Sequence, residues 1–145
     1  MPDGQFYLAF IWHEKEMNSL QDKYSKIIEN KLHRYISLIN KVKNINLEIE
    51  KLSYISNEDK IIKSLEKIKR TKEIEIEKIN NALSVLDIRQ RKIIELRYIG
   101  PELLEWNKIS EIMDLTDTTC RTIRNEAIEK MVPIIFIKND SEKIS

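Results

Sequence analysis

The sequence contains few of the residues that end or cross-link secondary structure. It has one cysteine, Cys120, among 145 residues, together with only two glycines and three prolines. A single cysteine excludes an intramolecular disulfide and is typical of a protein in a reducing cytoplasm, which is the location we expect. The scarcity of glycine and proline leaves little material for hairpin turns, so short strands are not expected.

Long hydrophobic runs and metal-ligand patterns are missing as well. The longest apolar runs, residues 6–12 and 132–137, fall well short of the roughly 20 residues that cross a bilayer, so no membrane association is expected. Asp3 lies where a secretory signal peptide would be basic, and we expect no such signal. Neither His13 nor His33 has a partner at metal-ligand spacing, so we expect no metal and no other cofactor.

The chain also lacks an excess of one charge. Its formal net charge is +1, and residues 84–132 hold 8 Lys and Arg against 9 Asp and Glu. Residues 1–83 hold 15 against 13, and residues 133–145 hold 2 against 2. The excess of positive charge that is typical of many nucleic-acid-binding proteins is therefore absent. Any nucleic-acid binding must depend on where individual basic residues lie.

What the sequence has in abundance is Ile, Leu, Lys, Glu and Asn, with 34% of all residues charged. This composition is typical of long solvent-bathed helices or coiled coils, and the predicted fold class is therefore all-α. A Gly-rich phosphate loop, a nucleophile–histidine pair and a carboxylate dyad in a pocket-forming fold are all missing from the pattern. We therefore expect that the protein is not an enzyme.

Residues 17–83 are predicted to form a helical hairpin. Between Tyr35 and Leu52 apolar residues recur at alternating steps of three and four, which is the seam of a coiled coil. Loop and cap residues at 53–59 then precede a second periodic run. An antiparallel hairpin buries both stripes most simply. The same stripe could instead serve a homodimer or a contact with RNA polymerase, and the sequence alone does not separate these.

The two ends of the chain differ from this pattern. Residues 1–16 are aromatic and carry a Gly and a Pro, and the periodic pattern begins near Met17. This poorly defined segment is either a loosely docked N-terminus, the product of a start codon placed too early, or an apolar hook for a partner. At the other end, residues 133–145 are assigned to a C-terminal tail.

The domain predicted over residues 84–132 begins with one helix. Asp87 is placed to cap a helix over 88–99, which the Gly-Pro pair that follows should end. Arg97 lies at the centre of an apolar arc on this helix. Because an unpaired buried charge is costly, we expect Arg97 to pair with an acid of the next helices, with Glu111 as the first candidate.

The helical periodicity of the same domain stops at residues 114–117 and resumes at once. Asp114 is expected to end a helix over 107–113 in a left-handed or bridging conformation, and Leu115 to point inward. Thr116 or Asp117 should cap the next helix. Such a break allows two short helices to cross steeply around one apolar corner, which predicts a helix-turn-helix.

The last helix has an apolar face, made by Cys120, Ile123, Ala127 and Met131, and an opposite polar face. Arg suits guanine and Asn suits adenine in the major groove, and the N-terminal half of a recognition helix usually enters it. The candidate DNA contacts on this helix are Thr118, Thr119, Arg121, Thr122, Arg124 and Asn125. Basic residues expected to contact the flanking phosphates are Arg89, Arg91, Lys92 and Lys108.

These two stretches, "LDIRQRKIIELRYIG" and "KISEIMDLTDTTCRTIRNEAIEKM", resemble the C-terminal helix-turn-helix of sigma factors, which reads the promoter −35 element. The whole layout resembles the small phage-encoded transcriptional regulators of the RinA and ArpU type. Asp114 stands where that pattern usually has Gly. The residues that carry the resemblance are Leu86, 89–98, 109–112, Leu115, Thr116, 119–121, Ala127, Lys130 and Met131.

The resemblance implies an all-α fold in which a long antiparallel, coiled-coil-like hairpin precedes a sigma-region-4-like helix-turn-helix domain. It also implies a sequence-specific DNA-binding activator of phage or prophage late genes, with double-stranded DNA as its partner. Because one such module binds DNA weakly, a homodimer is expected. The alternative is a coiled-coil adaptor whose sigma-like domain binds RNA polymerase or another regulator and not DNA.

Overall fold

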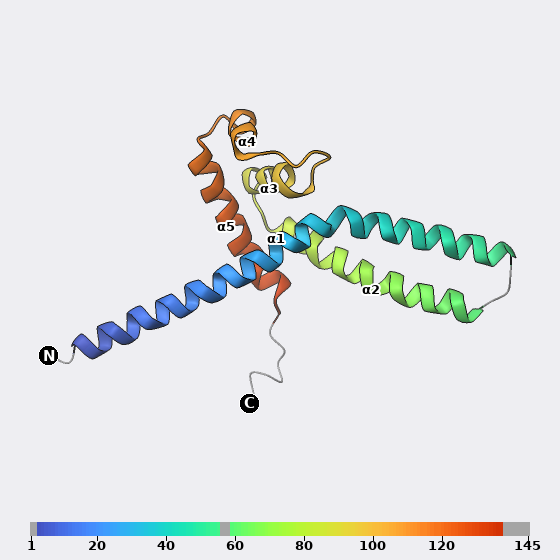
Figure 1. Cartoon of the computed structure of the whole chain (residues 1–145), viewed down its shortest axis with the longest axis horizontal. Helices are drawn as coiled ribbons and strands as arrows, with labels where there is room; N and C mark the ends of the chain where they lie inside the picture. The colour runs from blue at the N-terminus through green and yellow to red at the C-terminus, as the bar shows by residue number, and fades with distance from the viewer. Residues whose placement is uncertain (1–2, 56–58, 138–145) are drawn as a thin grey trace.

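The computed structural model describes the backbone of residues 3–55 and 59–137, and the side chains of these residues from Asp22 onward. Within these ranges the regular structure is helical and no strand is present, so the predicted all-α class is confirmed. Figure 1 shows the arrangement. The helices are α1 (Asp3–Ile55), α2 (Asp59–Ser84), α3 (Ile88–Ile94), the π-helical segment η1 (Glu95–Ile99), α4 (Trp106–Met113) and α5 (Asp117–Ile135).

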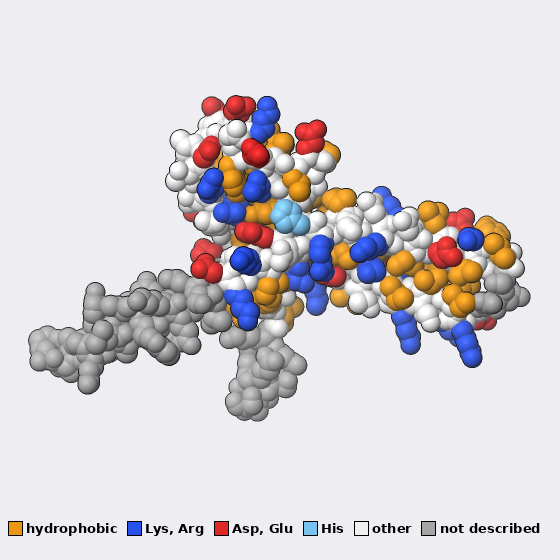
Figure 2. Space-filling view, viewed as in Figure 1, with side chains coloured by type: hydrophobic (Ala, Val, Ile, Leu, Met, Phe, Trp, Pro, Cys, Tyr) orange, Lys and Arg blue, Asp and Glu red, His pale blue; other side chains and the backbone are white. Residues whose placement is uncertain are grey.

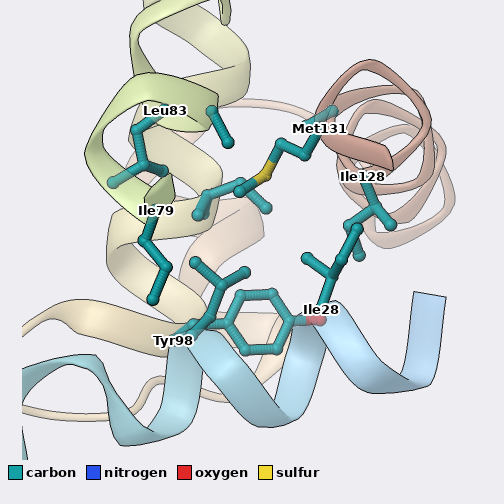
Figure 3. Packing of buried hydrophobic residues seen from close by; sticks show 10 residues of the cluster. Ile28, Ile79, Leu83, Tyr98, Ile128 and Met131 are labelled. Atoms are coloured by element: carbon teal, nitrogen blue, oxygen red, sulfur yellow. The ribbon is translucent and has the colours of Figure 1, made fainter. Parts of the chain in front are cut away.

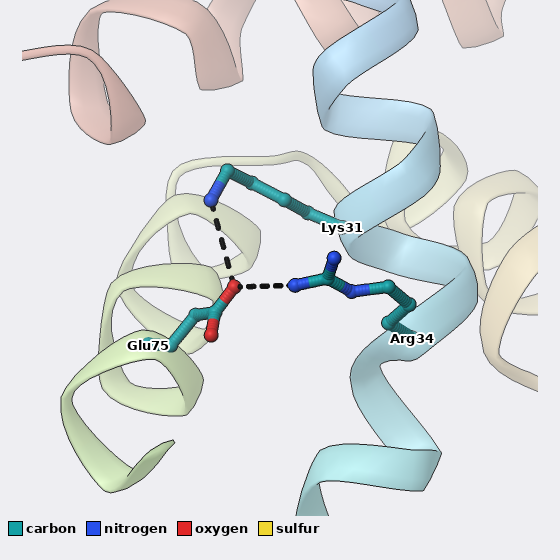
Figure 4. Close-up of polar contacts among 3 residues, drawn as sticks. All are labelled: Lys31, Arg34 and Glu75. Atoms are coloured by element: carbon teal, nitrogen blue, oxygen red, sulfur yellow. Dashed lines mark hydrogen bonds and ion pairs between the residues drawn. The ribbon is translucent and has the colours of Figure 1, made fainter. Parts of the chain in front are cut away.

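Helix α2 runs back along the second half of α1 in the opposite direction (Figure 1). Leu38 of α1 is buried, and so is Ile79 of α2. Beside the apolar seam, the Glu75 carboxylate accepts a hydrogen bond from Arg34 Nη2 at 3.1 Å and lies 3.6 Å from Lys31 Nζ (Figure 4). Opposite charges at these flanking positions favour this register of the two helices.

Helix α1 begins earlier than the sequence pattern indicates. Its backbone is helical without interruption from Asp3 to Ile55, so the change in amino-acid composition near Met17 is not a break in secondary structure. The physical reason is that no Gly or Pro occurs between residues 5 and 55 to end a helix. The side chains of residues 1–21 lie outside the described residues, and the apolar hook stays a prediction.

Helix α5 crosses α1 near the middle of α1, and a central core of buried side chains lies between the helices at this crossing (Figures 1 and 3). This core joins α1, α2, α3, η1 and α5, so the boundary predicted between residues 83 and 84 is spanned by common packing. Each large aliphatic side chain that is fully buried contributes about 1.5–3 kcal/mol. The buried residues of the central core are Ile28, Leu32, Ile79, Ala82, Leu83, Ile94, Tyr98, Ala127, Ile128 and Met131.

The C-terminal boundary also differs from the prediction. Helix α5 continues through Pro133 to Ile135, so the segment assigned to a tail begins inside a helix. Ile134 and Ile135 pack against the central core, and the Phe136 ring lies 4.6 Å from the Tyr24 ring of α1. Burial of these side chains outweighs the missing N–H of the proline. Residues 138–145 lie outside the described residues.

Helix α3 starts and η1 ends close to the predicted positions. Asp87 Oδ1 accepts a hydrogen bond from the Gln90 N–H at 2.7 Å, and Gln90 Oε1 accepts one from the Asp87 N–H at 3.1 Å, which confirms Asp87 as the cap. Gly100 ends the π-helical segment, and its backbone nitrogen lies 2.6 Å from the Glu95 carbonyl oxygen, to which it donates. Its φ of −58° is not left-handed. Glycine fits because a Cβ would lie 3.1 Å from that oxygen.

Candidate nucleic-acid interface

A second, smaller core holds α3, α4 and α5 together. Its buried residues are Ile93, Ile109, Cys120 and Ile123. We call this set the small core. Ile109 is the buried residue of α4, and it lies among residues of both neighbouring helices. Because α4 is a short helix, this packing is what fixes its position against α5.

The connection between α4 and α5 turns at Asp114. This residue has φ 56° and ψ 45°, which is the left-handed one of the two conformations predicted for it. Its N–H points at the carbonyl oxygens of Ser110 and Glu111, and the Leu115 N–H donates to the Ser110 oxygen at 3.1 Å. Asp is one of the side chains that tolerate this conformation, and the free carbonyls of the helix end are thereby used.

The residues after Asp114 also take their predicted places. Leu115 is half-buried against the small core. Thr116 precedes α5 with an extended backbone, and its hydroxyl oxygen accepts a hydrogen bond from the Thr119 N–H at 3.1 Å. Such a cap satisfies an otherwise unpaired donor of the first turn. A helix through residues 109–131 is therefore interrupted at 114–116 and not continuous.

Helix α5 separates its side chains by face as the periodicity indicates. Cys120, Ile123, Ala127 and Met131 are buried. Thr118, Arg121, Thr122 and Asn125 are exposed and come from the N-terminal half of the helix. We call these four residues the polar face of α5. The Thr122 hydroxyl donates to the Thr118 carbonyl oxygen at 2.9 Å, which leaves its own oxygen free to accept.

The buried thiol of Cys120 offers a test of this packing. Burial raises its pKa above the ordinary value, and the nearby Asp117 carboxylate adds to the shift. Folding therefore favours the protonated thiol, so stability should decrease once pH rises above about 8.5, where an unfolded thiol ionises. At pH 8 the native protein should react with iodoacetamide much more slowly than the denatured one, as measured by mass spectrometry. Rapid alkylation without unfolding would contradict the small core.

Arg124 is the predicted DNA contact that the structure turns inward. Its side chain is only 19% exposed. Arg124 Nη1 donates to the Tyr98 hydroxyl at 2.9 Å and lies 3.5 Å from Glu29 Oε1 of α1, while Nε donates to Asn125 Oδ1 at 2.7 Å. Burial raises the pKa of Tyr98, and the hydrogen bond from Arg124 opposes that shift. Arg124 thus joins α5 to η1 and α1.

Arg97 does not pair with Glu111, so that prediction is wrong. Arg97 Nη1 donates to the Leu104 carbonyl oxygen at 2.9 Å, and its guanidinium carbon lies 5.0 Å from the centre of the Trp106 ring. The Glu111 carboxylate instead lies 3.6 Å from Lys108 Nζ of the same helix. The connection 100–105 brings a carbonyl group within reach, and a neutral acceptor together with an aromatic face stabilises the half-buried cation.

The remaining predicted phosphate contacts are exposed, and three of them line a hollow that no residue of α5 lines. Lys108 lies on α4. Arg89, Arg91 and Lys92 line a shallow hollow of about 680 Å³ whose lining includes Met113 and no residue of α5. Arg91 is paired there with Glu95 at 3.0 Å. Thr119, the last predicted contact, is exposed and its hydroxyl accepts from Thr116 at 2.7 Å.

A cleft of about 780 Å³ between α1 and α5 was not predicted from the sequence. Lys23 and Lys26 line it from α1, and Asn125 lines it from α5. Its acidic lining residues include Glu29 and Glu129, so the cleft is not uniformly basic. On the face drawn in Figure 2, Lys and Arg side chains lie over α5 and beside the crossing with α1, interspersed with acidic ones.

Three residues that contact Arg121 or Arg124 were missed by sequence reasoning. Trp106 lies beside Arg121, with the guanidinium carbon 5.6 Å from the ring centre, while Tyr98 and Glu29 hold Arg124. Trp106 carries a signal that could have been used, since tryptophan is highly buried on average and this one directly precedes the helix predicted over 107–113. Glu29 carries none, because the crossing of α1 over α5 cannot be inferred from periodicity.

Comparisons with family models, curated proteins and solved structures gave no match to this chain. The candidate interface is therefore defined by its own geometry alone. Across residues 3–55 and 59–137, no helix has a stretch both long and apolar enough to span a bilayer. The same part of the chain contains no cluster of three His, Cys, Asp or Glu side chains arranged to hold a metal ion.

Proposed function

We propose that the protein is a sequence-specific DNA-binding transcriptional regulator, with α4 and α5 acting as a helix-turn-helix of the sigma-region-4 kind. The observation that carries the proposal is the corner at Asp114. It separates two helices that share the small core, and it leaves the polar face of α5 exposed. A capped helix with an exposed polar face in its N-terminal half has the form that enters a major groove.

The chemistry of that face fits base recognition. Arg121 offers paired donors that match the O6 and N7 acceptors of guanine, and Asn125 offers the donor and acceptor that match adenine. Thr118 and Thr122 add hydroxyl groups that bond to bases or phosphates. Lys23 and Lys26 of α1 border the same helix and would lie toward the flanking backbone. Acidic residues, Asp22, Glu29 and Glu129, line the same cleft, so the proposal depends on these two lysines individually and not on a basic surface.

The hairpin of α1 and α2 supplies the second part of the proposal. Large apolar side chains remain exposed on it, among them Leu47, Tyr54, Ile55 and Ile68. Figure 2 shows hydrophobic side chains gathered toward its outer end. We propose that the hairpin either forms a homodimer, which would bring two reading helices to one operator, or contacts RNA polymerase. The phage or prophage late-gene role rests on the family resemblance.

A specific observation favours a second candidate, an adaptor that binds protein and not DNA. Residues 84–132 carry no excess of positive charge, and Ile88 on α3 is 91% exposed at the edge of the hollow formed with Met113. An exposed isoleucine of this kind suits a protein partner. The two candidates differ in salt dependence, because phosphate contacts release counterions and an apolar docking surface does not.

The test is selection of binding sites from a pool of random DNA duplexes, followed by affinity measurements at several salt concentrations. We expect an enriched sequence and an affinity that falls steeply with salt. Arg121→Ala should weaken binding to that sequence by about 1–3 kcal/mol, which is roughly 5- to 150-fold. The exposed Arg70 of α2 provides the matched control, and Arg70→Ala should bind as the wild type does.

The contrary results are equally clear. If no sequence is enriched and affinity for DNA does not change with salt, the adaptor is the better description. If Arg121→Ala binds the selected site as well as the wild type, Arg121 does not belong to the interface. Immunoprecipitation of the tagged protein with its bound chromosomal DNA tests the regulatory role, and a strong peak beside a prophage late operon is expected.

A further inference from the structure

Three arginines from two helical segments surround one tryptophan. The guanidinium carbons of Arg97, Arg121 and Arg124 lie 5.0, 5.6 and 5.0 Å from the centre of the Trp106 ring. The indole itself is half-buried and packs against the small core, which holds it in place. A fixed aromatic face attracts cations through its quadrupole, so it orders the side chains that lie on it.

The three arginines are not equivalent. Arg97 is held by the Leu104 carbonyl, and Arg124 by Tyr98, Glu29 and Asn125. Arg121 is exposed, and within the described residues it makes neither a hydrogen bond nor an ion pair. Its guanidinium group is therefore placed by the indole alone, and its donors remain available to a ligand.

The cluster is also unbalanced in charge. Glu29, 3.5 Å from Arg124, is the carboxylate that pairs with it in the described part of the chain, whereas three guanidinium groups share the indole. Like charges around one ring repel, and a ligand with two acceptor atoms beside Arg121 would relieve part of the repulsion. Arg121 is the exposed member of the three, and it lies one turn from Thr118 and Asn125 on the polar face of α5.

We infer that Trp106 is a positioning residue that orders Arg121 for a bidentate contact with a guanine base in the major groove. The inference rests on the proposed function and adds to it a named specificity element. A mobile arginine loses conformational freedom when it binds, and a side chain already lying on a ring loses less. Trp106 would thus raise affinity for the correct base without contacting the DNA itself.

The first arm of the test needs no DNA. Protons that lie over an aromatic ring are shifted upfield in NMR spectra, so the side-chain methylene protons of Arg121 should resonate upfield of those of Arg70. The shift should disappear in Trp106→Leu, which keeps an apolar side chain on the small core, and persist in Trp106→Phe. Thermal melting must first show that both variants fold. Unshifted Arg121 resonances in the wild type would overturn the stacking.

The second arm uses the DNA site selected for the wild-type protein, with each guanine in turn replaced by 7-deazaguanine, which lacks the N7 acceptor. One replacement should weaken wild-type binding by about tenfold. Trp106→Leu should bind the unmodified site about two- to tenfold less tightly and be less sensitive to that replacement. Trp106→Phe should restore most of both properties.

Three further outcomes of the DNA-binding arm distinguish failure of this inference from failure of the proposed function. If Trp106→Leu weakens binding to selected and scrambled DNA equally, Arg121 contacts phosphate and the base contact is overturned. If the wild type binds no DNA while the upfield shift is present, the proposed function fails, and with it the base contact, although the stack is real. If DNA binds with specificity but no guanine is sensitive, the proposed function stands and this inference fails.

Discussion

Asp114→Pro is expected to destabilise the protein by about 3 kcal/mol or more and to reduce its DNA affinity to the non-specific level. Proline holds φ near −65°, whereas Asp114 has φ 56°. The substitution also removes the N–H that points at the Ser110 and Glu111 carbonyls. Thermal or urea unfolding measures the first effect, and binding to the selected duplex measures the second.

Asp114→Gly is the matched control for this position. Glycine adopts the left-handed conformation without steric cost, so its stability should stay within about 1 kcal/mol of the wild type. Its DNA affinity should be unchanged, since the Asp114 side chain is not among the proposed contacts. If the proline variant melted and bound as the glycine variant does, the corner between α4 and α5 would not have the geometry described.

Ile109→Ala should produce the second large effect. Ile109 is fully buried in the small core, and truncation of such a side chain typically costs about 2–5 kcal/mol, because transfer energy is lost and a cavity remains. Since α4 is held chiefly by this packing, the loss should appear both as a lower unfolding free energy in urea and as weaker specific DNA binding. The slope of affinity against salt should change little, because no phosphate contact is removed.

Ile112→Ala provides the comparison within the same helix. Ile112 is 48% exposed, so its truncation should change stability by no more than about 0.5–1 kcal/mol. The two variants remove the same atoms from the same helix and differ in burial. Equal effects from Ile109→Ala and Ile112→Ala would show that α4 does not dock through the face that the structure assigns.

The features that could be predicted from the sequence are those set by local chemistry. Side-chain hydrogen bonding accounts for the left-handed conformation of Asp114 and the cap at Thr116. The cap at Asp87 follows in the same way. Helical periodicity accounts for the buried face of α5. Each of these depends on residues within a few positions of one another, so the pattern carries the information.

The features that could not be predicted depend on contacts between distant segments. Arg97 was matched to the wrong partner because its acceptor, the Leu104 carbonyl, lies in a connection with no periodic signal. The inward turn of Arg124 depends on Glu29, which only the crossing of α1 and α5 brings near. A surface-facing arginine and an arginine held by a distant helix have the same local sequence pattern, so the distinction requires the tertiary structure.

The length of α1 has a mechanical consequence. At about 1.5 Å per residue its 53 residues extend about 80 Å, and one uninterrupted helix takes part both in the hairpin and in the crossing with α5. Between the outer end of the hairpin and that crossing, the backbone of α1 has no break in its helix. A partner bound at the outer end of the hairpin would therefore hold the same helix that packs against α5.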